Sequence, residues 1–192
     1  MTPPILQQLP KEIHTERLLL RVPRTGDGES LYNAISESVL ELRRFLASLP
    51  WVASEQSVES SEIFCRNAES NFIARRDLPY LLWEKSSGLV VGAAGLHRTD
   101  WNTPKTEIGY WCRTSKTGNG YVSEAVESLV NVAFHELKVA RVELITDEQN
   151  LESRRVAQRC HFELEGILRH ERKAPDGTLR NTCIYARLPP EA

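Results

Sequence analysis

The sequence has little of what marks a membrane, secreted or nucleic-acid-binding protein. Its 192 residues carry a formal net charge of −2, and a nucleic-acid partner usually requires a clustered basic excess, so none is expected. No stretch approaches the roughly 20 apolar residues that span a bilayer. The first ten residues hold prolines and glutamines where a signal peptide has an apolar run. We therefore expect a cytoplasmic protein without a membrane partner.

The cysteines give no sign of a metal site or a disulfide framework. There are four of them, widely spaced, with no CxxC pair and no histidine at ligand spacing: Cys65, Cys112, Cys160 and Cys183. Zinc sites and disulfide-rich domains both need closer or more regular spacing. We expect reduced thiols, as in cytoplasm, and no metal.

The length and the 41% apolar content fit one domain with one sizeable core. We predict a single domain at 15–188, with an N-terminal extension at 1–14 and a tail at 189–192. The proline-rich ends, 1–10 and 189–192, are expected to be loose. Strands are predicted at 16–22, 80–85, 89–97, 106–112, 140–146, 162–173 and 178–188. Helices are predicted within 27–76, broken at Pro50 and Trp51, and at 121–138 and 151–160.

This order of elements predicts an α/β fold with a mixed sheet. The strand at 106–112, the helix after it and the strand at 140–146 form a crossover unit, which makes the two strands parallel neighbours. Antiparallel hairpins flank the pair on both sides, one of them closed by the Pro-Asp-Gly turn within 174–177.

The predicted helix at 121–138 begins directly from a glycine loop, Thr117-Gly118-Asn119-Gly120. Glycines let backbone N–H groups approach an anion, and a helix start adds a positive dipole end. A tight turn with positive φ is an equally simple interpretation. No GxxxxGK[ST] is present and the third glycine of the dinucleotide fingerprint is missing, so a nucleotide motif is excluded. Gly92 and Gly95 lie inside a predicted strand and indicate a bulge or a close backbone approach.

Motifs in a fixed order connect the chain to a known superfamily. They are TERLLLR at 15–21, EIGYW at 107–111, GNGYVSEA at 118–125, NLES at 150–153, HF at 161–162, EGILR at 165–169 and YAR at 185–187. In this order the chain resembles the GNAT superfamily of acetyl-CoA-dependent N-acetyltransferases. Within it, the chain is similar to the branch of the ribosomal-protein N-terminal acetyltransferases RimJ and RimL.

The resemblance implies a GNAT fold with a splayed parallel pair at the centre of the sheet and acetyl-CoA as cosubstrate. The pyrophosphate loop would be Gly118, Asn119, Gly120, Tyr121 and Val122. Backbone along the pantetheine arm would come from Trp111, Cys112 and Arg113. Thr117 stands where Gln or Arg is usual and Val122 where Gly or Ala is usual. Lys116 is a possible substitute for the missing side chain, and weaker CoA binding is the other outcome.

Asn150 and Ser153 form a second constellation. From the residues alone, Asn150 reads as a helix N-cap and Ser153 as a residue that solvates the first turn. The resemblance implies instead that this Asn-x-x-Ser holds the pantetheine arm and that Ser153 protonates the leaving thiolate. The tyrosine that many GNAT enzymes place further along this helix is missing from 154–160.

Glu107 is the leading candidate for the general base. Strand alternation puts Glu107, Gly109 and Trp111 on one face, where the carboxylate would act directly or through water. A strand-edge carboxylate that bonds a neighbouring loop is the alternative. The resemblance also implies a carboxylate on the next-to-last strand, but Arg172 occupies that position. Glu171 beside it is expected on the opposite face, so that role does not transfer.

The acceptor is expected to be an amine, possibly a protein N-terminus. Residues 27–71 hold eight acids and three bases, an arrangement that attracts a basic peptide, a polyamine or an aminoglycoside, or that forms ordinary solvated helix faces. Trp51 and Trp101 line the acceptor pocket or pack under loops.

The sequence thus predicts an N-acetyltransferase that moves an acetyl group to a primary amine by direct attack, with a protein N-terminal α-amine as the expected acceptor. A covalent intermediate is not expected, because Cys112 and Cys160 lack a partnered base. The alternatives are a polyamine or aminoglycoside acetyltransferase and a non-catalytic CoA-binding regulatory protein. Relatives of this kind are often homodimers, but the sequence has no signature for one.

Overall fold

The computed structural model describes residues 3–174 and 176–190. Its helical elements are η1 (Pro4–Leu6), α1 (Gly28–Leu46), α2 (Pro50–Ala53), α3 (Val58–Ile73), η2 (Thr114–Lys116), α4 (Tyr121–His135) and α5 (Leu151–Arg159). The strands are β1 (Glu12–His14), β2 (Leu18–Arg21), β3 (Leu78–Glu84), β4 (Val90–Asp100), β5 (Lys105–Cys112), β6 (Arg141–Asp147), β7 (Glu163–Lys173) and β8 (Leu179–Arg187). None of the described helices is long and apolar enough to cross a membrane.

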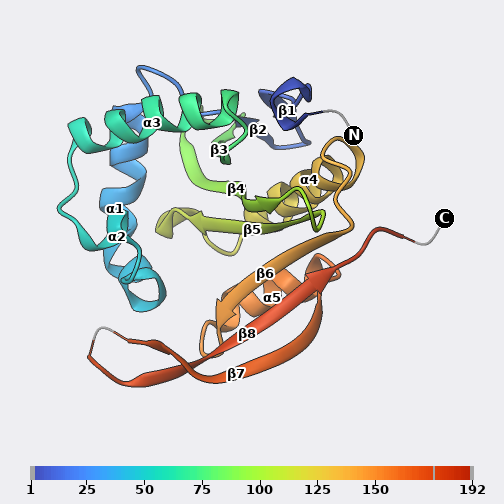
Figure 1. Cartoon of the computed structure of the whole chain (residues 1–192). Helices are drawn as coiled ribbons and strands as arrows, with labels where there is room; N and C mark the ends of the chain where they lie inside the picture. The colour runs from blue at the N-terminus through green and yellow to red at the C-terminus, as the bar shows by residue number, and fades with distance from the viewer. Residues whose placement is uncertain (1–2, 175, 191–192) are drawn as a thin grey trace.

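The strands form one mixed sheet in the order β1-β2-β3-β4-β5-β6-β8-β7. Every pair is antiparallel except β5 and β6, which confirms the predicted crossover. The parallel register covers Lys105 with Arg141, Thr106 with Val142 and Glu107 with Glu143. Beyond these pairs both strands continue without registered partners between them. The central pair is therefore splayed, and Figure 1 shows β6, β8 and β7 diverging from β5.

Helices cover the two faces of the sheet with different parts of the core. On one face, α1 packs its buried apolar side chains against Leu81, Val90 and Trp111. On the other face, α4 and α5 pack against the apolar residues of β2, β4, β5, β6 and β8. Alternation along β5 assigns Ile108 and Tyr110 to the α4 face and Trp111 to the α1 face. Glu107 and Gly109 share the face of Trp111.

Several predicted bounds differ from the structure: β1 lies in the predicted N-terminal extension, and β4 continues to Asp100 where a strand ending at 97 was predicted. Helix α4 ends at His135 and not at Lys138, because Lys138 has a left-handed φ of 57° and the Val139 N–H bonds back to Ala133 O. Two residues of the N-terminal stretch that was expected to be loose are hydrogen-bonded to the rest of the chain. Arg75 Nη2 donates to Gln7 O at 2.6 Å, and Tyr80 Oη donates to Pro10 O at 2.7 Å.

The glycine predicted to mark a close approach does so. A methyl group on Gly92 would lie 2.3 Å from the Trp111 carbonyl oxygen, and the β3–β4 register shifts next to Gly92, between Leu82 and Trp83. The predicted turn at 174–177 includes Pro175, which lies outside the described residues. Gly177 within that turn has φ of 88°.

Candidate active site

The glycine loop leaves the start of α4 without a cap. Gly118 and Gly120 have φ of 77° and 78°, and Gly120 is the N-cap residue with no side-chain cap bond. Within the described part of the chain, no protein acceptor bonds the backbone N–H groups of residues 118–120. A left-handed glycine costs little where another residue is strained. The loop therefore presents a row of N–H donors and the positive end of α4 to an anion.

Arg17 is the basic side chain at this loop. Its Nη1 donates to Asn119 O at 2.8 Å, and its guanidinium lies 4.8 Å from the centre of the Tyr121 ring. Glu124 holds it with two contacts of 2.7 Å. In the sequence, Arg17 is marked only by its place in the TERLLLR motif that supports the resemblance, and it is not among the predicted site residues.

The side chains of Lys116 and Thr117 form hydrogen bonds within the protein. Thr117 Oγ1 donates to Thr114 O at 2.9 Å, and Lys116 Nζ donates to Glu84 at 2.7 Å. Glu84 also accepts from Ser87 and Tyr121. These donors, Lys116 first, lower the pKa of Glu84 to about 2. Lys116 thus ties the loop to β3, and Arg17, which Glu124 holds, is the second cation beside the loop.

Trp111, Cys112 and Arg113 lie at the end of β5 where the parallel pair has separated. Trp111 is buried and packs against Trp51, with ring centres 6.1 Å apart. The Arg113 N–H donates to Val91 O at 2.8 Å, so it is directed to β4 and not toward β6. Burial raises the pKa of the Cys112 thiol to about 11, which keeps it protonated and a poor nucleophile.

Asn150 is the N-cap of helix α5, as predicted from the residues alone. Asn150 Oδ1 caps α5 by accepting from the Ser153 N–H at 3.2 Å. The Ser153 hydroxyl forms a hydrogen bond with Tyr110, whose Oη lies 2.9 Å from Ser153 Oγ. Tyr110 belongs to the EIGYW motif but is not a predicted site residue. Burial raises the pKa of the Tyr110 phenol. A neutral hydroxyl pair therefore joins β5 to α5 beside the splayed seam.

On the α1 face, Glu107 is not a free carboxylate. Its Oε2 lies 2.5 Å from Arg98 Nη1, and its side chain is 17% exposed. Its register partner on β4 is His97, whose Nδ1 lies 2.6 Å from Asp77 Oδ1. His97 and Asp77 are not among the predicted site residues, because 20 residues separate them in the sequence and no motif contains both.

A bulge changes the expected placement of Glu171 and Arg172. His170 has a left-handed φ of 55°, and the β7–β8 register shifts between Leu168 and Arg172. Alternation fails there, so both side chains reach Thr182 Oγ1, Glu171 at 2.5 Å and Arg172 at 2.8 Å. The prediction that Glu171 and Arg172 lie on opposite faces of the strand is wrong because of this bulge.

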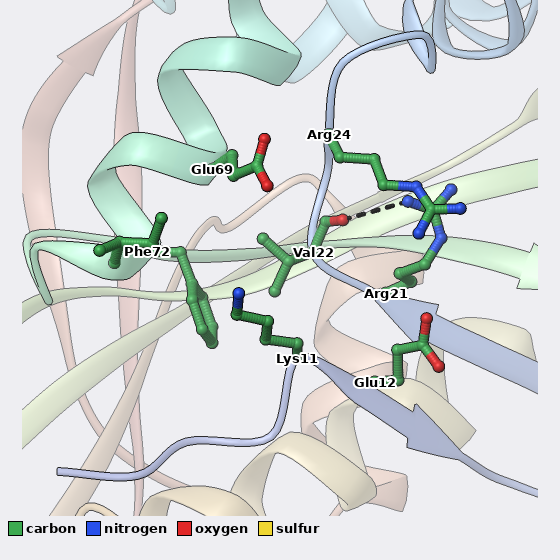
Figure 2. Close-up of a pocket in the computed structure, with 8 residues that line it drawn as sticks. Lys11, Glu12, Arg21, Val22, Arg24, Glu69 and Phe72 are labelled. Atoms are coloured by element: carbon green, nitrogen blue, oxygen red, sulfur yellow. Dashed lines mark hydrogen bonds between the residues drawn. The ribbon is translucent and has the colours of Figure 1, made fainter.

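Two hollows lined by described residues lie away from the glycine loop. Figure 2 shows the one of about 440 Å³ between β1, β2 and α3, lined by Lys11, Glu12, Arg21, Val22, Arg24, Glu69, Phe72 and Ile73. None of these is a predicted site residue. The other, of about 610 Å³, lies between the end of α1 and the β7–β8 hairpin and is lined by Arg44, Phe45, Gln149, Ala174, Asp176, Thr178, Leu179 and Arg180. No described group of three His, Cys, Asp or Glu side chains is placed to hold a metal ion.

Comparison with known proteins decides the family. A family profile described as an acetyltransferase (GNAT) domain matches residues 17–163. The chain belongs to the GNAT acetyltransferases. Like other members, this GNAT protein is an N-acetyltransferase with acetyl-CoA as the donor. Its uncapped helix start, Arg17 and splayed parallel pair suit a long, anionic cosubstrate.

Individual relatives support this assignment over nearly the whole chain. An uncharacterised N-acetyltransferase, p20 of Bacillus licheniformis, is 26% identical and the match covers 92% of this chain and 95% of p20. The ribosomal-protein-serine acetyltransferase of Escherichia coli is 25% identical, with 91% and 94% covered. The fold matches the microcin C7 self-immunity acetyltransferase MccE, solved with acetyl-CoA and AMP, at a TM-score of 0.84 and 22% identity, with 96% and 99% covered.

Proposed function

We propose that this GNAT enzyme acetylates the α-amine of a protein or peptide N-terminus. The observation that carries the proposal is the similarity, over 91% of this chain, to the Escherichia coli relative that is named a ribosomal-protein-serine acetyltransferase, a name that gives a protein acceptor.

The acidic residues of 27–71 give little extra attraction for a polycation. Four of the eight carboxylates are already in ion pairs: Asp27 with Arg21, Glu37 with Arg113, Glu41 with Arg44 and Glu62 with Arg66. Paired carboxylates present less negative charge to a ligand. The interpretation of this region as ordinary helix surface is therefore favoured over an acidic roof for the acceptor.

The ionisation of the acceptor also favours an α-amine. A peptide α-amine has a pKa of about 7.7 to 8.0, so an appreciable fraction is neutral near pH 7. A lysine at about 10.4 needs roughly 4.6 kcal/mol for deprotonation at the same pH.

In this proposal the chain contributes three groups of residues to the reaction. The loop N–H donors of residues 118–122, aided by Arg17, hold the pyrophosphate, and Trp111, Cys112, Arg113 and Asn150 border the pantetheine arm. Ser153 supplies a proton to the sulfur as the C–S bond breaks. The amine forms the new N–C bond and gives up a proton. Glu107, the base predicted from the sequence, is already engaged by Arg98.

The test is thiol release from acetyl-CoA with a panel of acceptors. Calorimetry first measures acetyl-CoA binding, and the panel then contains peptides with free N-termini, spermidine and an aminoglycoside. Each peptide has a matched control with a blocked N-terminus and the same lysines. We expect turnover with free peptides only, and mass spectrometry should place the acetyl group on the α-amine. Preference for spermidine or the aminoglycoside would overturn the acceptor class, while binding without any turnover would favour a regulatory protein.

A further inference from the structure

A histidine and an aspartate form a dyad on the α1 face of the sheet. His97 Nδ1 lies 2.6 Å from Asp77 Oδ1. A carboxylate only accepts, so Nδ1 is the donor in this bond, and in the neutral ring Nε2 is then the acceptor. His97 is on β4 and Asp77 directly precedes β3. Their side chains are 33% and 36% exposed, so a substrate can reach the ring. A carboxylate that fixes one tautomer of an imidazole is the arrangement of a general base.

The sheet is shaped to seat this imidazole. Gly95 and Gly109 are register partners on β4 and β5. A methyl group on Gly95 would lie 2.8 Å from His97 Cε1, and one on Gly109 would lie 3.1 Å from Cδ2. Both glycines therefore leave the space that the ring fills. The Nε2 atom lies over the same pair, 2.9 Å from a methyl group on Gly95 and 3.2 Å from one on Gly109, and Gly109 is two residues from Trp111 on β5.

The backbone after His97 is unusual in a way that fits a functional side chain. Arg98 has a left-handed φ of 51°, and the β4–β5 register shifts between His97 and Asp100. A non-glycine residue in this conformation is strained by about 1–3 kcal/mol, and bulges next to active sites redirect side chains. The same residue, Arg98, also holds Glu107 at 2.5 Å.

We propose that His97, oriented by Asp77, is the general base of the acetyl transfer. This inference rests on the proposed function. As the amine nitrogen bonds the acetyl carbon and the C–S bond breaks, the amine proton passes to His97 Nε2, which later returns it to solvent. The charged groups that face His97 are Asp77, Glu107 and Arg98. The side chain of Glu107 is paired with Arg98, and Glu107 is the register partner of His97 on β5.

The test compares His97→Gln with His135→Gln, an exposed histidine in the last turn of α4. We expect His97→Gln to lower kcat about 100-fold, the usual size of a general-base contribution, with little change in the KM for acetyl-CoA. On a free-N-terminus peptide, log(kcat/KM) should rise with a slope of about 2 in acid, because the amine and His97 both lose a proton. The slope should fall to about 1 in His97→Gln. A variant that keeps both the slope and kcat would overturn the assignment.

A second variant leaves the dyad residues in place. Gly109→Ala puts a methyl group against the His97 ring, whereas Gly166→Ala adds one in open space. We expect Gly109→Ala to lower kcat about tenfold and Gly166→Ala to have no effect. Equal activity of the two variants would show that the seat of the ring does not matter for the reaction.

A measurement without acceptor separates this inference from the proposed function. Nitrogen-15 NMR of histidine-labelled protein, assigned with His97→Gln, should show the Nδ1–H tautomer of His97. Acetyl-CoA should shift its Nε2 signal and leave that of His135 unchanged. If this shift occurs but no acceptor turns over, the proposed function fails and the placement of the dyad stands. If acetyl-CoA leaves His97 Nε2 unchanged, the base assignment fails whatever the acceptor.

Discussion

Tyr110 Oη lies 2.9 Å from Ser153 Oγ and 3.2 Å from the carbonyl oxygen of the same residue. The contact joins β5 to α5 across the place where the parallel strands separate. Either hydroxyl can donate in the contact between Oη and Oγ, and when the phenol donates, the serine proton is free to point to another acceptor, such as a departing sulfur. Helix α5 has no tyrosine of its own, and Tyr110 on β5 brings a tyrosine hydroxyl to Ser153.

Ser153→Ala should lower kcat about 10- to 100-fold and change acetyl-CoA affinity less than about threefold, because it removes the proposed proton donor of the thiolate. Tyr110→Phe keeps the ring and should lower kcat about tenfold. Steady-state kinetics and calorimetry check both. A large loss of affinity with normal kcat would make Ser153 a pantetheine contact only.

Gly120→Asp should abolish CoA binding, at least 100-fold by calorimetry, since it places a carboxylate at the proposed phosphate site. Gly120→Asn is the matched control, because Asn tolerates the left-handed φ of 78° and has the same size without charge. We expect the Asn variant to bind within about tenfold of the wild type. Similar affinities for the Asp variant and the wild type would show that the pyrophosphate binds elsewhere.

Glu84→Gln should lower stability by about 2 kcal/mol, the usual effect of losing hydrogen bonds to a charged group, or roughly 4–8 °C in Tm. The folded pKa of Glu84 is about 2 against an ordinary 4.5. Its stabilisation is therefore present above pH 4.5 and is lost as pH falls toward 2. Denaturant unfolding across that window should show the two proteins converging in acid. Glu163→Gln, at an exposed carboxylate, should show no such convergence.

Gly92→Ala should destabilise the protein by about 2 kcal/mol, because the added methyl group overlaps the Trp111 carbonyl and forces β4 and β5 apart. Acetyl-CoA affinity should fall with it, since Trp111 borders the proposed pantetheine arm. Thermal unfolding and calorimetry check this. Gly166→Ala, with nothing within 4 Å, should match the wild type in both.

The fold was predictable because local patterns and the order of motifs agree. Helix α4, the β5–β6 crossover and the glycine loop each have strong local signals. The candidate site was predictable where its residues share one segment, as with Gly118 and Gly120. His97 and Asp77 were not, because their contact depends on the pairing of β3 with β4 and on a bulge at Arg98. The ion pair of Lys116 with Glu84 and the contact of Arg17 with the glycine loop were not predictable either, because both depend on tertiary contacts.

The sheet has two unequal parts, which are connected by only three registered residue pairs between β5 and β6. Five strands, β1 to β5, lie on one side and three, β6 to β8, on the other. Helix α4 connects them along the chain, and the Tyr110–Ser153 hydroxyl pair connects them at the open end. A cosubstrate arm lying in this opening would act as a cross-link between the two parts. The amides at the ends of β5 and β6 should then exchange with solvent faster than those of β3 and β4, and acetyl-CoA should slow them.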